Sequence, residues 1–104
     1  MSEQMHLACK EGDIGGYVLL PGDPGRCETI AALLDHPQKI AQNREFVTYT
    51  GSLCGEQVSV CSTGIGGPST AIAVEELHAL GAHTLLRIGT CGGMNKNVRA
   101  EDIV

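Results

Sequence analysis

The sequence predicts an α/β fold in which helices pack against a central β-sheet. Short apolar runs of strand character alternate with two segments of helical spacing, and glycine-rich loops follow three of the runs. This order of strand, helix, a group of strands, helix and strand is typical of layered α/β proteins. With 104 residues, of which 42% are apolar, the chain has room for one modest domain at most.

The first strand is predicted at Tyr17–Leu20, a short apolar run. Asp23 then supplies an N-cap and is followed by proline at the first helical position. A helix is therefore expected from about Pro24 to Asp35, with Pro37 ending it.

Three strands are expected next, and β-branched and aromatic residues favour the extended state in the middle one. Cys54-Gly55 has the pattern of a two-residue hairpin turn between the last two. The expected strands are Lys39–Gln42, Phe46–Leu53 and Gln57–Cys61.

A glycine-rich loop from Ser62 to Pro68 opens the second predicted helix, and Gly81 ends it. The last predicted strand is His83–Ile88. Helical spacing assigns the buried face of the helix to Ala71, Val74, Leu77 and the neighbouring Ala79 and Leu80.

Composition suggests that the chain is part of something larger. One Phe, two Tyr and no Trp leave a core of small aliphatic residues, which buries less area per residue than an aromatic core. The last residues, Glu101–Val104, have the character of a strand that begins there. We therefore expect residues 1–104 to be the N-terminal part of a single domain, interrupted in a strand.

Charge and apolar patterning exclude two classes of partner. Seven Lys and Arg against twelve Asp and Glu give a formal charge of −5, which leaves no basic footprint for nucleic acid. The apolar runs are too short to span a bilayer, and the polar start Met1–Gln4 has no signal-peptide character. A cytoplasmic protein without a membrane or nucleic-acid partner is expected.

The five cysteines predict reduced, non-catalytic thiols, because their number is odd and no CxxC spacing occurs. Cys27 and Cys61 lie in apolar stretches and are expected in the core, whereas Cys91 lies in a glycine-rich loop. Three histidines have a spacing unsuited to a metal site: His36, His78 and His83.

The candidate binding residues follow three of the predicted strands. In α/β sheets ligands collect at the carboxyl ends of strands, and glycine lets main-chain N–H groups approach them closely. Arg26, Arg87 and the Thr90 hydroxyl, together with loop amides at helix N-termini, would suit a phosphate oxyanion. Any one loop could be only a tight turn, but the three together favour an anion site. The loops are Gly22–Arg26, Ser62–Ser69 and Arg87–Gly93.

Two common nucleotide-binding motifs are absent. No Gly-Lys-Ser/Thr of a P-loop follows any of the strands, and Gly64-Ile65-Gly66-Gly67-Pro68 breaks the GxGxxG spacing. Nucleoside triphosphates and NAD are therefore weak candidates.

Several motifs together resemble the nucleoside phosphorylase superfamily and, within it, the branch that acts on uridine. They occur in order across essentially the whole chain: Pro21–Arg26, Arg44–Phe46, Ser62–Ser69, Ala73–Leu77 and Leu86–Thr90. The resemblance implies a three-layer αβα phosphorylase/hydrolase-like fold with a central mixed β-sheet, of which this chain is the N-terminal part.

The resemblance also implies a reaction, the reversible phosphorolysis of uridine to uracil and ribose 1-phosphate in pyrimidine nucleoside salvage. Inorganic phosphate would be the co-substrate, and no cofactor would be required. Arg87 and Thr90 would serve catalysis, and Arg44 would reach the phosphate from a neighbouring subunit. The phosphate-binding residues would be Gly22, Arg26, Arg44, Arg87 and Thr90.

Further roles carried by the resemblance concern the nucleoside and the assembly. His6 would cross a dimer interface to the nucleoside 5′-hydroxyl, and a homo-oligomer, a hexamer built of dimers, is expected. Cys91 departs from the threonine or serine typical of its position. The nucleoside-binding residues would be His6, Thr90, Cys91 and Gly92. A monovalent cation, typically potassium, would lie at the dimer interface near Glu45, Ile65 and Ser69.

Two other interpretations stay open. The chain could belong to a purine nucleoside phosphorylase or a nucleosidase, since the family's base-reading residues lie beyond Val104. Hydrolases of the superfamily tend to lack the phosphate arginines, so Arg26 and Arg87 favour phosphorolysis. The chain could also be a non-catalytic anion-binding fragment or interaction module, and 104 residues alone are expected to have little activity.

Overall fold

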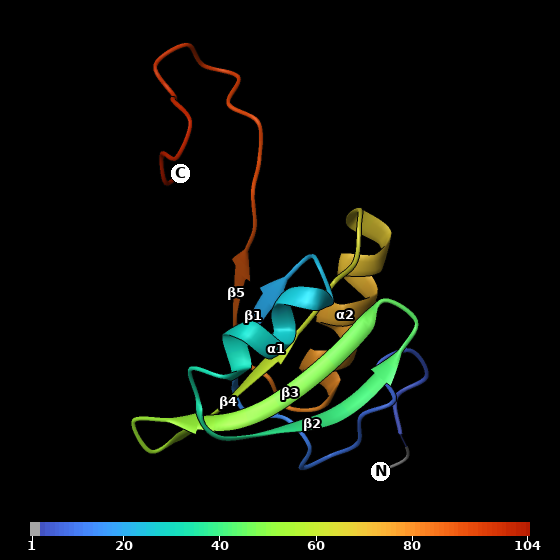
Figure 1. The fold of residues 1–104 in the computed structure, drawn as a ribbon. Helices are drawn as coiled ribbons and strands as arrows, with labels where there is room; N and C mark the ends of the chain where they lie inside the picture. The colour runs from blue at the N-terminus through green and yellow to red at the C-terminus, as the bar shows by residue number, and fades with distance from the viewer. Residues whose placement is uncertain (1–2) are drawn as a thin grey trace.

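A computed structural model describes residues 3–104 and contains five strands and two helices, the α/β fold predicted from the sequence (Figure 1). In chain order the elements are β1 (Tyr17–Pro21), α1 (Gly25–Ala31), β2 (Asp35–Asn43), β3 (Phe46–Leu53), β4 (Glu56–Cys61), α2 (Gly67–Ala79) and β5 (Thr84–Ile88).

The five strands form one mixed sheet in the order β2-β3-β4-β1-β5. Strands β4, β1 and β5 are parallel, whereas β2, β3 and β4 are antiparallel. The connection from β4 to β5 crosses over β1 through α2, so the carboxyl ends of three parallel strands lie at one end of the sheet. The start of β3 lies at the same end, because β3 runs antiparallel to β4.

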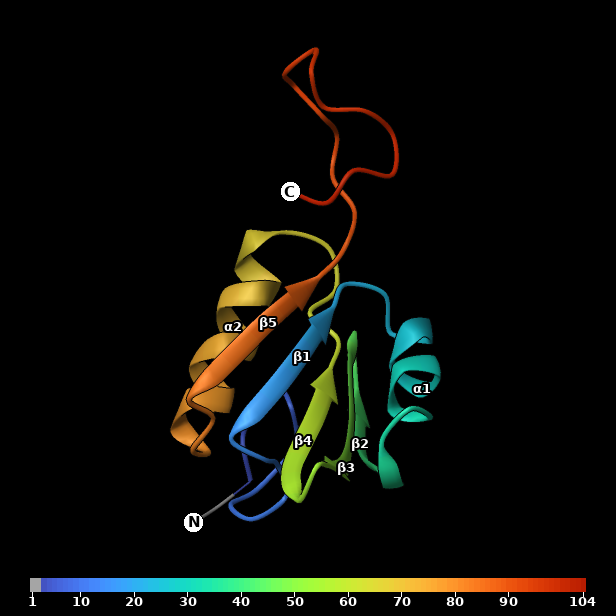
Figure 2. The ribbon, with the colours of Figure 1, turned by 90° about the vertical axis from the view of Figure 1, so that its left-hand side faces the viewer.

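The two helices cover opposite faces of the sheet, which gives the expected three layers (Figure 2). On the α2 face, Leu77 and Ala73 pack with Phe46, the largest of the fully buried side chains. On the α1 face, the smaller cluster is built around Cys27 and Val60. Burial of both Cys27 and Cys61, each 0% exposed, confirms their prediction as core residues.

The first helix is shorter than predicted. It begins at Gly25 with Pro24 as its N-cap residue, so the predicted N-cap Asp23 lies one position too early, although its Oδ1 accepts a hydrogen bond from the Gly25 N–H at 2.9 Å. The helix ends at Ala31, four residues before the predicted Asp35, and Pro37 lies inside β2 instead of ending the helix. A proline is tolerated there because β2 is an edge strand with a register shift between Asp35 and Gln38.

The predicted hairpin turn at Cys54-Gly55 is confirmed. Leu53 pairs with Glu56, so Cys54 and Gly55 are the two connecting residues. Their φ angles are +52° and +82°, and positive φ at both positions is the signature of a type I′ turn. The Cβ atom of Cys54 makes this conformation costly, whereas Gly55 adopts it freely.

The second helix forms as predicted, and its buried face is the predicted one only in part: Leu77 and Leu80 are buried and Val74 packs against the core, whereas Ala79 is exposed. Ser69, Ala73 and Leu77 are its buried residues, whereas the predicted Ala71 is exposed. The run Ala71–Val74 is apolar throughout, so its periodicity does not fix which residues point inward; packing against the sheet decides it. The helix ends at Ala79, and Gly81 terminates it as expected with a φ of +104°, which lets Ala82 N donate to Leu77 O.

Residues 89–104 form no helix or strand. The strand expected to begin at Glu101–Val104 does not form, because these residues pair with no other strand of the described chain. Neither of the two helices within residues 3–104 has the length and apolar character needed to cross a membrane.

Candidate anion-binding site

A cleft of about 600 Å³ lies where the three predicted binding loops meet. Its walls come from the segments that follow β1, β4 and β5, joined by the turn between β2 and β3. The lining residues are Gly22, Asp23, Pro24, Arg26, Glu45, Gly64, Ile65, Gly66, Arg87, Gly89 and Thr90. The sheet topology thus brings together four of the five predicted phosphate-binding residues.

Two arginines supply the positive charge of the cleft. Arg26 lies in the first turn of α1 and Arg87 in β5, so the two come from opposite sides of β1. Neither forms an ion pair with any of residues 3–104. Their charge is therefore available to an anionic ligand, for which a guanidinium offers a fork of parallel N–H donors.

Main-chain groups hold the Arg87 side chain at the mouth of the cleft. Its Nη1 donates to the carbonyl of Leu20 at 3.2 Å and also to the carbonyl of Ile88. A Cβ atom at Gly89 would overlap Nη1, and one at Gly22 would lie 3.0 Å from Nη2. The guanidinium in this position therefore uses space that a side chain at Gly89 would fill and that one at Gly22 would narrow.

The carboxylate of Glu45 reaches the cleft because the start of β3 is tied to the end of β4. Ser62 Oγ donates to Glu45 O at 2.6 Å and accepts from Val47 N at 2.8 Å. Glu45 then packs on Gly64, where a Cβ atom would lie 2.5 Å from its Cγ. A carboxylate beside an anion site is suited to bind a cation or a hydroxyl, not the anion itself.

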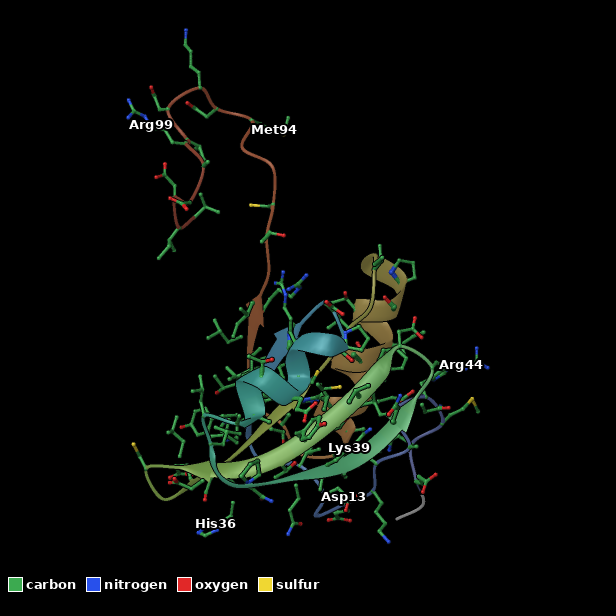
Figure 3. The ribbon with its side chains drawn as sticks, in the orientation of Figure 1. Asp13, His36, Lys39, Arg44, Met94 and Arg99 are labelled. Carbon is green, nitrogen blue, oxygen red and sulfur yellow. The ribbon has the colours of Figure 1, made fainter. Side chains whose placement is uncertain are left out.

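Several predicted residues lie outside the cleft. Arg44 is exposed in the β2–β3 turn and points away from the fold (Figure 3). Cys91 and Gly92 lie in the last segment and line a separate hollow with residues near the C-terminus. Ser69 is buried, and its hydroxyl donates to Gly66 O at 3.1 Å. His6 lies beside α2, where its imidazole pairs with Glu76.

The buried thiols are unreactive at neutral pH. Burial raises the pKa of Cys61 to about 12, and it also raises the pKa of Cys9 and Cys27. These groups therefore stay protonated at neutral pH and are poor nucleophiles. Within residues 3–104 no group of three or more His, Cys, Asp or Glu side chains is placed to hold a metal ion.

The sequence did not point to two residues that contact the predicted site residues or line the cleft. Asp23 was assigned only a capping role, yet it also lines the cleft. Glu76 had no assigned role, although it follows the buried Ala73 by three residues and precedes the buried Leu80 by four. An acidic residue at this spacing lies on the same side of the helix as the buried residues. Its position therefore signals that another part of the chain forms a hydrogen bond or ion pair with it.

The chain is similar to known phosphorylases along its length. A profile of the phosphorylase superfamily matches residues 17–104. A uridine phosphorylase of Treponema pallidum is 59% identical over 97% of this chain and 39% of its own length. A guanosine phosphorylase of Halorubrum lacusprofundi is 47% identical over the whole chain and 43% of its own length.

The fold is similar as well. The crystal structure of uridine phosphorylase from Vibrio fischeri superimposes with a TM-score of 0.90 at 39% sequence identity. The match covers 95% of this chain and 41% of that structure. The chain thus spans about two fifths of the length of the relatives it matches.

Proposed function

Because this chain belongs to the phosphorylase superfamily, we propose that it forms the N-terminal, phosphate-binding part of a uridine phosphorylase domain. The activity would be the reversible phosphorolysis of uridine to uracil and ribose 1-phosphate. Support for the uridine branch comes from relatives of that name with up to 59% identity, since no cleft residue by itself distinguishes one base from another.

One observation carries the proposal: two arginines without ion-pair partners in the described chain converge on a single cleft with Thr90 and glycine-rich loops. A phosphate dianion needs several N–H and O–H donors and nearby positive charge, and the two guanidiniums, the Thr90 hydroxyl and the loop amides would supply them, although Asp23 and Glu45 also line the cleft. The donors come from separate strand ends, so the sheet itself sets their spacing.

The proposed mechanism follows from charge. Breaking the bond between ribose C1′ and the base nitrogen moves its electron pair to the base and leaves oxocarbenium character on the sugar. A phosphate held by Arg26, Arg87 and Thr90 would stabilise that cation and donate an oxygen lone pair to C1′. The chain's task is to orient the phosphate, which removes much of the entropic cost of bringing two substrates together.

Two of the remaining predicted roles, those of Arg44 and His6, require a second copy of the chain. Arg44 points away from the fold (Figure 3) and does not line its own cleft, which suits a residue that serves the cleft of a neighbouring subunit. His6 would likewise contact the nucleoside 5′-hydroxyl of a partner's site, while Thr90, Cys91 and Gly92 would contact the nucleoside in their own. We therefore propose a dimer as the working unit of a hexamer.

A monovalent cation such as potassium is part of the same proposal. Glu45 and Ile65 line the cleft, and Ser69 would add its hydroxyl oxygen. One chain offers few oxygen ligands there, so a partner subunit would complete the site.

The free state of all five cysteines supports a cytoplasmic location.

The test follows uracil release from uridine by a full-length version of the protein, with and without inorganic phosphate. We expect turnover to depend on phosphate and to yield ribose 1-phosphate, with little or no turnover by residues 1–104 alone. Equal rates without phosphate would show a nucleosidase instead.

The second candidate is a purine nucleoside phosphorylase, which the similarity to a guanosine phosphorylase favours. A higher kcat/KM for guanosine or inosine than for uridine would establish it. The anion-binding alternative predicts phosphate binding by calorimetry without release of any base.

A further inference from the structure

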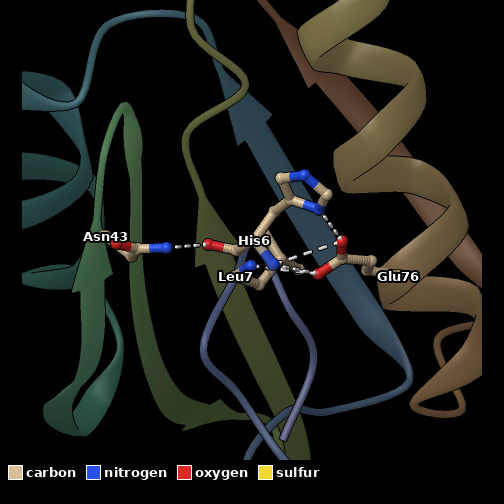
Figure 4. Close-up of polar contacts among 4 residues, drawn as sticks. All are labelled: His6, Leu7, Asn43 and Glu76. Atoms are coloured by element: carbon tan, nitrogen blue, oxygen red, sulfur yellow. Dashed lines mark hydrogen bonds and ion pairs between the residues drawn. The ribbon is translucent and has the colours of Figure 1, made fainter.

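The N-terminal segment is held by one carboxylate on α2 (Figure 4). Glu76 Oε1 accepts hydrogen bonds from the main-chain N–H groups of His6 at 3.1 Å and Leu7 at 3.0 Å. Its Oε2 lies 2.5 Å from Nδ1 of the His6 imidazole. A single side chain therefore fixes both the main chain and the ring of His6.

The sheet holds His6 from the opposite side. Asn43, the last residue of β2, donates from Nδ2 to His6 O at 2.8 Å. The next residue, Leu7, is fully buried in the core. The main chain of His6 is thus held in place by contacts with both β2 and α2, although His6 precedes the first strand.

The Glu76 carboxylate is ionised in this setting. Its side chain is 14% exposed, and burial opposes the charge, but the hydrogen bonds from Leu7 and His6 outweigh burial and lower its pKa. An ionised carboxylate only accepts hydrogen bonds. The proton between the two groups therefore belongs to Nδ1 of His6.

This arrangement leaves the second ring nitrogen free for a ligand. In Figure 4, Nε2 of His6 points away from the Glu76 carboxylate, and no residue of the described range 3–104 bonds to it. With Nδ1 protonated, Nε2 of the neutral ring carries a lone pair, and Nε2 of the charged ring carries an N–H. Either form can bind a hydroxyl group.

We infer that Glu76 is a positioning residue that fixes the tautomer and direction of His6 so that Nε2 meets the ribose 5′-hydroxyl of the nucleoside. The inference rests on the proposed function for its ligand. The placement of the ring rests only on the contacts within this chain, so the two parts can be tested separately.

The first arm of the test measures the tautomer without any substrate. Long-range 1H–15N correlation spectra of the 15N-labelled chain are recorded for the natural sequence, Glu76→Gln and the matched control Glu75→Gln, which alters the exposed neighbour on the same helix. We expect the Nδ1–H tautomer in the natural chain and in E75Q, and its loss in E76Q. The Nε2–H tautomer in the natural chain, or no change in E76Q, overturns the inference.

The second arm compares uridine with 5′-deoxyuridine, which lacks the hydroxyl, in the full-length protein. We expect E76Q to lower kcat/KM for uridine about tenfold, the scale of a lost charge-assisted hydrogen bond. The loss should vanish for 5′-deoxyuridine and in a His6→Ala background. Equal losses on both nucleosides would mean that Glu76 only supports the fold.

The two proposals fail in different ways. If the natural full-length protein cleaves neither nucleoside, the proposed function is wrong, and the tautomer measurement alone decides whether Glu76 positions His6. If uridine is cleaved but E76Q leaves its kcat/KM unchanged, the proposed function stands and the positioning role is wrong.

Discussion

Among single residues, Arg87 depends most on its surroundings. Its guanidinium rests on the main-chain carbonyls of Leu20 and Ile88, in space left by Gly22 and Gly89. These contacts use N–H donors of one nitrogen, Nη1, and leave those of Nη2 for a ligand. The side chain is therefore pre-oriented before any anion arrives, which lowers the entropic cost of binding.

We expect Arg87→Lys to raise the KM for phosphate by about 10- to 100-fold in the full-length enzyme, because the ammonium keeps the charge but loses the planar fork. Steady-state kinetics with varied phosphate at saturating uridine measures the effect. Arg99→Lys, at an exposed arginine outside the cleft, is the matched control. An unchanged phosphate KM in R87K would exclude Arg87 from phosphate binding.

The sequence pointed to the cleft residues more readily than to His6 and Glu76. Arg26 opens a helix, Arg87 lies near the end of a strand and Thr90 follows that strand, so simple rules of α/β folds place them at one edge. The contact between His6 and Glu76 joins residues 70 positions apart. No local pattern encodes such a distance, and only the packing of the N-terminal segment between β2 and α2 creates it.

Among the elements, the hairpin was the easiest to predict and the face of α2 the hardest. A two-residue turn has a strict requirement for positive φ, which Gly55 signals directly. The α2 helix carries apolar residues on more than one side, so its exposed and buried faces differ little in composition. Where the pattern is weak, the sheet beneath the helix decides its rotation.

The hairpin gives a test of backbone strain. Gly55→Ala should lower the free energy of unfolding by about 1 kcal/mol, and Cys54→Asn should raise it by about 0.5–1 kcal/mol, because asparagine tolerates the left-handed region. No atom lies within 4 Å of a Cβ at Gly55, so backbone strain is the only cost. Urea unfolding of the 104-residue chain measures both. A destabilised C54N would contradict a type I′ turn.

For the whole molecule, the main contrast is between the layered body and the last segment. Residues 15–88 contain the sheet and both helices, whereas residues 89–104 have neither strand nor helix and are exposed throughout. Figure 1 shows this segment extending from the end of β5, away from the sheet. The main-chain groups there are open to solvent.

Limited proteolysis should reveal this contrast. We expect trypsin to cut first after Lys96 and Arg99, because cleavage needs an extended backbone that the sheet does not offer. Mass spectrometry of early time points identifies the fragments, and a Lys96→Gln, Arg99→Gln variant should delay the first cut. Early cleavage within residues 15–88 would mean that the sheet opens more readily than the structure indicates.

The two edges of the sheet are not equivalent. At β2, Pro37 lacks an N–H group and two register shifts interrupt the strand, whereas β5 runs in unbroken register beside β1. Of the two edges, β5 therefore offers a further strand the more regular row of main-chain groups. In the proposed phosphorylase domain, a further strand of the same sheet would therefore pair with β5 and not with β2.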